Sequence, residues 1–272
     1  MATILEQIVV RKKREVAEAI DRTPLSEVQR QATEASEPRP FLASLVSEQP
    51  GSPTSVIAEI KRKSPSAGII RDDFDPLIIA RQYHEAGARA ISCLTDEEDF
   101  GGKLDFIEQI RQVVDLPVLR KDFIVDSYQI WEARAAGADA ILLIAECLDT
   151  ETMLSCHSLA NDLGMTALVE VHTEENLHRV LDSISFSRQG NSLLGINNRD
   201  LARMKTDLAH TARLLATLDN EAIEKTLVVS ESGIKTPDDL ATLQSYGVGI
   251  VLVGEHLMAQ PNPGQALRTL LS

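Results

Sequence analysis

The sequence is poor in cysteine and in long apolar runs. Its 272 residues include three cysteines, Cys93, Cys147 and Cys156, and none belongs to a CxxC pair. This spacing gives no sign of a disulfide framework or a zinc site, and it favours a reducing compartment. No apolar run approaches the roughly 20 residues that a membrane-spanning helix needs. We therefore expect neither a small disulfide-stabilised protein nor a membrane-spanning protein.

Basic residues are also scarce. The chain has 27 Lys and Arg against 41 Asp and Glu, a formal net charge of −14. A nucleic-acid-binding surface or a polybasic membrane patch is a poor expectation for such a chain. The first residues lack a secretory pattern, because Glu6 and Gln7 interrupt the apolar residues and the basic residues 11–14 follow them. We therefore expect a cytoplasmic protein with no nucleic-acid or membrane partner and no obligate protein partner.

The chain divides into a helical part and a longer α/β part. Turn-forming residues at 47–53 separate the two. We expect an N-terminal helical extension over residues 1–46 and a barrel over residues 47–272, within a single structural domain overall. The helical expectation rests on apolar residues spaced about three and four apart, namely Ile4, Leu5, Ile8, Val9, Val16 and Ile20.

Eight short β-rich apolar runs occur in the second part, at residues 55–60, 90–94, 117–119, 138–145, 166–171, 193–196, 227–229 and 249–253. Helical stretches lie between them, such as 76–85, 106–113, 128–135 and 237–245, and several end in glycine. Their number and spacing predict an α/β fold, a (β/α)8 TIM barrel. A doubly wound open sheet is the main alternative. It would normally carry a glycine-rich loop after its first strand, where this chain has Lys61-Arg62-Lys63-Ser64-Pro65.

Charged and polar residues end these strands at positions of equal parity. Alternate side chains of a barrel strand point to the same side, and the carboxyl ends of the strands form the mouth where such enzymes place their chemistry. A structural ion pair would explain any one of these charges, but a buried cluster of six is costly unless it has a function. The residues expected at the mouth are Glu59, Lys61, Lys121, Glu170, Asn197, Arg199 and Glu231.

Two turns near the end of the chain suggest an anion site. Ser232 and Gly233 follow the seventh run, and Gly254 and Glu255 follow the eighth. Barrels often bind phosphate with the backbone amides of these two loops, and glycine lets the backbone approach an anion closely. With Lys61 as countercharge, they favour a phosphorylated small-molecule substrate.

Two other features have ordinary interpretations. The acidic run at residues 96–99 is typical of a solvated loop, and Phe100 with the two glycines after it suggests a mobile flap. His172 lies two residues beyond Glu170 and is a candidate for contact with the mouth. One histidine and one glutamate do not make a metal site, so we expect no metal there.

Six segments carry a family resemblance: residues 58–66, 94–96, 119–123, 168–172, 195–201 and 230–234, which read AEIKRKSPS, LTD, LRKDF, LVEVH, GINNRDL and SESGI. In this order, and with the N-terminal helical extension, the chain resembles the indole-3-glycerol phosphate synthase family of tryptophan biosynthesis over nearly its whole length. The segment at 254–258 differs slightly, since the family commonly has serine where His256 stands. That difference leaves the backbone contribution of Gly254 intact.

The resemblance implies a carboxy-lyase that needs no metal or redox cofactor. Its reaction converts 1-(2-carboxyphenylamino)-1-deoxyribulose 5-phosphate to indole-3-glycerol phosphate, CO2 and water. Lys121 is then the general acid. Glu170 serves as base and second acid, while Lys61 shares the acid work or binds the substrate carboxylate. The division of roles between the two lysines stays open.

The remaining implied roles concern orientation and binding. Glu59 and Glu231 keep the lysines charged and oriented, which with Asn197 completes a catalytic set of Lys121, Glu170, Lys61, Glu59, Asn197 and Glu231. The implied substrate-binding residues are Arg199, Ser64, Pro65, Phe100 and Phe123, of which Pro65 and the two phenylalanines form an apolar slot for the aromatic ring. The implied phosphate-binding residues are Lys61, Ser232, Gly233, Gly254 and Glu255.

Two alternatives differ from this interpretation. Another phosphate-binding barrel, such as phosphoribosylanthranilate isomerase, uses a Cys/Asp acid–base pair, whereas the first strand here ends in Glu59 and Lys61 and offers no cysteine. A non-catalytic barrel acting as a binding subunit would be expected to have lost the charges of the mouth, and this sequence keeps them.

Overall fold

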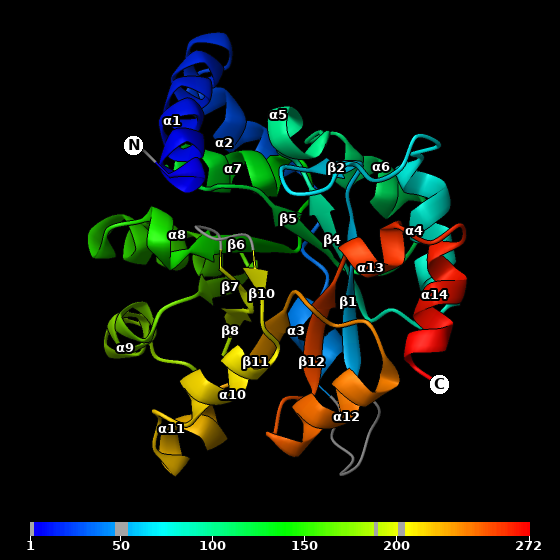
Figure 1. Cartoon of the computed structure of the whole chain (residues 1–272). Helices are drawn as coiled ribbons and strands as arrows, with labels where there is room; N and C mark the ends of the chain where they lie inside the picture. The colour runs from blue at the N-terminus through cyan, green and yellow to red at the C-terminus, as the bar shows by residue number, and fades with distance from the viewer. Residues whose placement is uncertain (1–2, 47–53, 188–189, 201–204) are drawn as a thin grey trace.

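A closed barrel of parallel strands forms the centre of the computed structural model, which describes residues 3–46, 54–187, 190–200 and 205–272 (Figure 1). The barrel strands are β1 (Ser55–Ile60), β4 (Ala90–Leu94), β5 (Val118–Lys121), β6 (Ala140–Ile144), β7 (Thr166–Val171), β8 (Ser192–Asn197), β11 (Val228–Glu231) and β12 (Ile250–Val253). They pair in the order β1-β12-β11-β8-β7-β6-β5-β4, and β4 closes the circle by pairing with β1. The expected (β/α)8 barrel is confirmed. The expected separator at residues 47–53 lies outside the described residues, as does Leu201.

Helices surround the strands, and four of them begin and end at the predicted residues. The helix α4 (Pro76–Glu85) illustrates the local cause. The side chain of Asp75 accepts hydrogen bonds from the backbone N–H groups of Leu77 and Ile78, at 2.9 and 3.1 Å, and Gly87 ends the turn with φ of 92°. Further helices around the barrel are α6 (Phe106–Val113), α7 (Tyr128–Ala135), α8 (Thr150–Asp162), α9 (Glu174–Ser183), α10 (Ala209–Leu215), α11 (Asn220–Lys225), α12 (Pro237–Ser245), α13 (Glu255–Met258) and α14 (Pro263–Leu270). The four that match the predicted ranges are α4, α6, α7 and α12.

The loops that follow some of the strands contain short secondary-structure elements. Two hairpins lie there, β2 (Lys63–Ser64) with β3 (Gly68–Ile69) and β9 (Arg199–Asp200) with β10 (Lys205–Thr206). A single 3-10 turn, η1 (Ala145–Cys147), follows β6. None of the helices in the described part of the chain has the length and apolar character of a membrane span.

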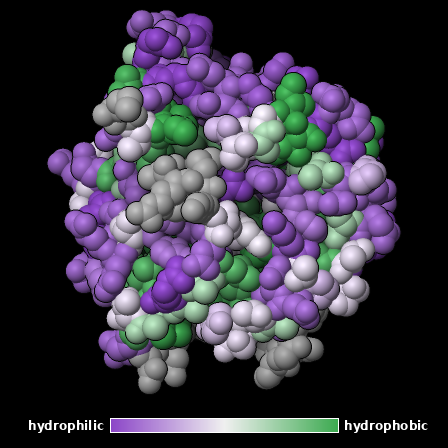
Figure 2. All heavy atoms as spheres, in the orientation of Figure 1, coloured by the Kyte–Doolittle hydropathy of each residue, from purple (hydrophilic) through white to green (hydrophobic). Residues whose placement is uncertain are grey.

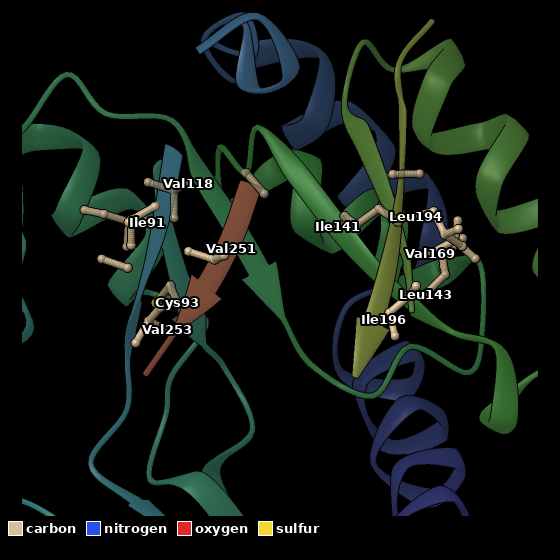
Figure 3. Packing of buried hydrophobic residues seen from close by; sticks show 14 of the residues in the cluster. Ile91, Cys93, Val118, Ile141, Leu143, Val169, Leu194, Ile196, Val251 and Val253 are labelled. Atoms are coloured by element: carbon tan, nitrogen blue, oxygen red, sulfur yellow. The ribbon is translucent and has the colours of Figure 1, made fainter. Parts of the chain in front are cut away.

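The strand side chains alternate between two apolar layers. One layer fills the barrel, with Ile57, Leu119, Leu142, Leu168, Val229 and Leu252 among its members. The other lies between the strands and the helices, and Figure 3 shows residues of this layer such as Ile91, Val118, Ile141, Val169, Leu194 and Val251. The parity assumed from the sequence is thereby confirmed, because Ile57 and Leu119 share the inner face with Glu59 and Lys121. On the molecular face in Figure 2, apolar residues form separate groups within a mostly hydrophilic surface.

The N-terminal helices run along the barrel from one end to the other. Ile4, Leu5 and Ile8 of α1 (Ile4–Arg22) line a cavity at the carboxyl ends of the strands. The next helix, α2 (Leu25–Glu34), packs on α7, as Figure 1 shows. Phe41 and Leu45 of α3 (Phe41–Leu45) join the apolar layer inside the barrel near the strand starts. The extension therefore forms part of the cavity wall at one end of the barrel and packs against the inner layer at the other.

A buried lysine fixes α1 to the mouth. Lys12 is 5% exposed, and its Nζ lies 2.8 Å from Asp96 Oδ2, 2.8 Å from Asp122 Oδ1 and 3.0 Å from Glu15 Oε2. Burial alone would lower the pKa of Lys12, but Asp122 and Asp96 raise it, so its ammonium stays charged. Asp122 directly follows Lys121, and Asp96 follows β4. The N-terminal helix is thus held by the ends of two barrel strands.

The acidic run at residues 96–99 is only partly the solvated loop that was expected, because Glu97 and Glu98 are exposed but lie on a short helix and Asp96 is buried. Asp96 is fully buried and caps the short helix α5 (Glu97–Phe100), accepting a 2.8 Å hydrogen bond from the backbone N–H of Asp99. Its other carboxylate oxygen, Oδ2, forms ion pairs with Lys12 Nζ at 2.8 Å and with Arg11 Nη2 at 2.9 Å. The cations that permit this burial come from α1, far away in the sequence, so the local composition did not reveal them.

Replacing Lys12 with methionine should destabilise the protein by about 3 kcal/mol, because Asp96 and Asp122 lose a buried countercharge. Urea unfolding followed by far-UV circular dichroism and by the fluorescence of Trp131 measures this. Trp131 is the sole tryptophan, and it packs beside Val16 of α1. The matched control is Arg14→Met, which removes an exposed cation from the same helix. Equal stability of the two variants would contradict the role given to Lys12.

Candidate active site

A cavity of about 510 Å³ opens at the carboxyl ends of the barrel strands. It collects side chains from strands and loops that are far apart in the sequence. Every residue given a catalytic, substrate-binding or phosphate-binding role in the sequence analysis lines it: Glu59, Lys61, Ser64, Pro65, Phe100, Lys121, Phe123, Glu170, Asn197, Arg199, Glu231, Ser232, Gly233, Gly254 and Glu255. The structure thus brings the whole predicted set together around one opening.

Lys121, the last residue of β5, occupies the centre of a cluster of carboxylates. Its Nζ lies 2.7 Å from Glu231 Oε2 and 3.5 Å from Glu170 Oε2. The Oε2 atom of Glu59 is 3.8 Å away. The three carboxylates come from three different strands, β11, β7 and β1, and each side chain is at most 5% exposed. One ammonium group therefore links three sides of the barrel.

Two further polar groups hold these carboxylates. The Nζ of Lys61 lies 2.7 Å from Glu59 Oε1. Asn197 donates a 2.9 Å hydrogen bond from Nδ2 to Glu170 Oε1, and its Oδ1 accepts one of 3.0 Å from the backbone N–H of Arg199. Glu59 and Glu170 are therefore each held by a second partner besides Lys121.

Burial and mutual charge shift the pKa values of Glu231, Glu59 and Lys121 within this cluster. Burial raises the pKa of Glu231 to about 8, with Lys121 opposing the rise and Glu170 adding to it. Burial also opposes the charge of Glu59, but Lys61 and Lys121 hold its pKa below the ordinary value. Burial would lower the pKa of Lys121, yet Glu231, Glu170 and Glu59 raise it. Glu231 thus keeps its proton to a higher pH than Glu59 does.

The Oε1 atom of Glu231 is buried and has no hydrogen-bond partner among the described residues. It lies against Gly195 of β8, where a Cβ atom would approach it to 2.5 Å. Glycine at this position therefore makes room for the carboxyl group. The unpartnered oxygen leaves Glu231 with hydrogen-bonding capacity that its protein neighbours do not use.

An aromatic pair forms one wall of the cavity. The rings of Phe100 and Phe123 lie 6.1 Å apart between centroids at an interplanar angle of 39°. Pro65 also lines the cavity, together with Ile8 of α1. Phe123 follows Lys121 by two residues, and both side chains line the same cavity. This surface suits a flat aromatic ring.

The loops after β11 and β12 present backbone to the cavity. Ser232 and Gly233 both have positive φ values, 68° and 86°. Gly254 lies against Glu59, and a side chain there would overlap Glu59 Oε1 and place its Cβ 2.8 Å from Glu59 Cδ. Lys235 and His256 also line this part of the cavity. The region therefore combines accessible backbone with a lysine.

Some lining residues were missed by the sequence analysis. Ile4, Leu5 and Ile8 carry an ordinary helical pattern, which says nothing about where the helix docks. Leu142 and Ile144 of β6 share one parity and line the cavity, a signal that the sequence did contain.

His172, which the sequence offered as a candidate for contact with the mouth, does not line the cavity. Its Nδ1 donates a 2.8 Å hydrogen bond to the backbone oxygen of Asn197. Its ring lies 4.7 Å from that of His210. The histidine therefore supports the loop after β8 from outside the cavity.

No group of three or more His, Cys, Asp or Glu in the described ranges is arranged to hold a metal ion.

Among solved structures, 3-hexulose-6-phosphate synthase from Salmonella typhimurium superposes with a TM-score of 0.62 at 13% sequence identity, covering 79% of this chain and 96% of that chain. At this identity the likeness is one of fold.

Sequence comparison is more specific. The family model for indole-3-glycerol phosphate synthase matches residues 5–270. Indole-3-glycerol phosphate synthase of Rhodopirellula baltica is 45% identical over 270 residues, covering 99% of both chains. The enzyme of that name from Roseiflexus castenholzii is 45% identical over 276 residues, covering 99% of this chain and 98% of its own. With the barrel, the charged mouth and these full-length matches in agreement, the chain belongs to the indole-3-glycerol phosphate synthase family.

Proposed function

We propose that the cavity at the barrel mouth catalyses the indole-forming ring closure with Lys121 as the central general acid. The substrate is 1-(2-carboxyphenylamino)-1-deoxyribulose 5-phosphate, and the products are indole-3-glycerol phosphate, CO2 and water. The observation that carries the proposal is the ammonium of Lys121, held by three carboxylates next to the aromatic wall of Phe100 and Phe123. That arrangement supplies a proton donor where the sugar ketone reacts.

Lys121 acts in the first step. The ring carbon that bears the carboxylate attacks the sugar ketone, and negative charge develops on the carbonyl oxygen. A charged ammonium beside that oxygen stabilises the developing charge and supplies the proton. The glutamates around Lys121 raise its pKa against the effect of burial, so its ammonium keeps its proton at neutral pH. Glu59 and Glu231 also fix the direction in which the ammonium points.

Glu170 and Lys61 act in the later steps. Loss of CO2 from the attacking ring carbon restores the aromatic ring. The hydroxyl group on the former ketone carbon must then depart as water, and a proton must be removed to complete the indole. Glu170 is the base and second acid for this exchange, and its hydrogen bond from Asn197 orients the carboxylate. Lys61 shares the acid work or holds the substrate carboxylate, with Glu59 as its ion-pair partner. Every proton is thus handled by a side chain of the cavity.

The remaining residues position the substrate. The aromatic ring packs between Phe100, Phe123 and Pro65, with Ser64 beside them, while Arg199 and Asn197 hold polar groups of the substrate. The phosphate lies at the loops after β11 and β12, a common phosphate position in barrels. Its contacts are Lys61, Ser232, Gly233, Gly254 and Glu255, the last through its backbone N–H at the start of α13.

The alternatives raised by the sequence lack support in the cavity. The lining contains no cysteine among the described residues, and the Cys/Asp chemistry of an isomerase would need one. A silent binding subunit would not need a lysine surrounded by three buried carboxylates. Ring closure accounts for both features.

Lys121→Met should abolish turnover, with a fall of at least about 10²-fold in kcat, because the general acid is lost. The measurement is the rise of indole fluorescence when purified protein is mixed with the carboxyphenylamino substrate in the presence of EDTA. Substrate binding by the variant should stay within a few-fold of wild type. Near-normal turnover would remove Lys121 from the acid role, and no product from the wild type would refute the proposed reaction.

Gly254→Ala should reduce kcat strongly while leaving the fold intact. The added methyl group would overlap Glu59 Oε1 and displace the carboxylate from Lys61 and Lys121. Gly249→Ala is the matched control, since a Cβ at Gly249 meets nothing within 4 Å. Kinetics and thermal unfolding of both variants provide the test. Wild-type kcat in Gly254→Ala would show that the carboxylate of Glu59 needs no fixed position.

The stability of the wild type relative to Glu231→Gln should fall as the pH rises from about 5 to about 8. Burial raises the pKa of this carboxyl to about 8 from an ordinary value of 4.5, so between these values the folded protein holds a proton that the unfolded chain has lost. The stabilisation is complete when the pH is below the pKa of Glu231 in the unfolded chain, and it is lost as the pH rises through the pKa of Glu231 in the folded protein. The amide of the variant cannot titrate, and urea unfolding at several pH values measures the difference. Parallel pH profiles for the two proteins would contradict the raised pKa.

A further inference from the structure

An ion pair crosses the barrel mouth over the loop that carries Ser232 and Gly233. Arg199 follows β8 and Glu255 follows β12, and their Nη2 and Oε2 atoms lie 2.7 Å apart. In the barrel, β11 lies between β8 and β12, so the pair spans the end of β11. Arg199 also donates a 2.7 Å hydrogen bond from Nη1 to Ser66 Oγ, in the loop after β1. One guanidinium therefore joins loops from three strands.

The carboxylate of Glu255 lies among cations. Burial opposes its charge, but the hydrogen bond and the charge of Arg199, together with Lys61 and Lys235, lower its pKa. Its side chain is 41% exposed, against 19% for that of Arg199, so Glu255 is the more accessible partner. The Nε atom of Arg199 is buried and has no partner within the described residues. An anionic side chain thus occupies the positive region beside the loops after β11 and β12.

We propose that the Glu255 carboxylate takes the place of the substrate's anionic end when no substrate is bound and competes with it for Arg199. The inference rests on the phosphate position proposed above, at Ser232, Gly233 and Gly254. A phosphate dianion beside these residues would lie close to Glu255, and two anions cannot share one set of cations without repulsion. Binding therefore requires the carboxylate to turn away, which its exposure permits. Glu255 lowers affinity for phosphate and keeps Arg199 neutralised between turnovers.

A purely supporting role for Glu255 predicts the opposite effect. If the carboxylate only held Arg199 in place for the substrate, its removal would loosen the guanidinium and weaken binding. Competition predicts tighter binding when the charge is removed. The sign of the change in affinity therefore separates the two roles.

The test is Glu255→Gln, which keeps the size of the side chain and an oxygen that accepts from Arg199 but removes the charge. The KM of the substrate and the inhibition constant of inorganic phosphate should both fall about five-fold, the equivalent of roughly 1 kcal/mol for a partly exposed ion pair. The control is Glu221→Gln, which removes the same charge from an exposed pair with Lys225 on α11. That variant should bind phosphate as the wild type does.

Each outcome has a distinct meaning. A lower inhibition constant in Glu255→Gln alone supports competition by the carboxylate. An unchanged or higher constant, with phosphate still competing against substrate in the wild type, overturns this inference and leaves the proposed function intact. A wild type that turns over substrate but is not inhibited by phosphate overturns the phosphate position and this inference with it. An equal gain in both variants assigns the effect to overall charge and also overturns the inference.

Discussion

The ammonium of Lys121 lies against the buried carboxylates of Glu59, Glu170 and Glu231, and this cluster makes the strictest demands on the fold. Burying charges is costly unless each has a partner at short range, so the strands that supply them must be fixed to within a fraction of an ångström. A closed barrel meets that demand because every strand is paired on both sides. Gly195 and Gly254 then leave the space that the carboxylates of Glu231 and Glu59 occupy. The charged cluster therefore requires both rigidly held strands and glycine at positions 195 and 254.

The buried lysine of α1 extends this arrangement to the N-terminal helix. Lys12 neutralises Asp122, and Asp122 lies between Lys121 and Phe123 in the chain. The Asp122 carboxylate also accepts hydrogen bonds from Thr95 Oγ1 at 2.6 Å and from the backbone N–H of Phe123 at 2.9 Å. The residue that joins Lys121 to Phe123 in the chain is therefore bound to α1. The extension is part of the construction of the site, although its own contribution to the cavity is apolar.

The sequence predicted the barrel and the mouth well because both depend on local periodicity. Alternation within strands placed Glu59, Lys121 and Glu170 on the inner face, and the glycines expected to end helices, at positions 87, 137, 164 and 247, all adopt a positive φ. Contacts between distant segments were not predictable in this way. Asp96 resembled a solvated residue because its cationic partners belong to α1, with Arg11 standing 85 positions earlier. The docking of α1 and the ion pair between Arg199 and Glu255 were also not predictable, because no local sequence pattern indicates them.

The route of the N-terminal helices constrains the order in which the protein assembles. Tyr128 Oη donates a 2.8 Å hydrogen bond to the backbone oxygen of Thr23, and these residues are 105 positions apart. The helices α1 and α2 leave the ribosome before β5 and α7, yet the surfaces on which they pack do not exist until β5 and α7 have been synthesised. Until then their apolar faces have nothing to pack on. During synthesis, docking of the extension therefore waits for α7, and a chain that stalls before α7 leaves Val16 and Val28 exposed to the other proteins around it.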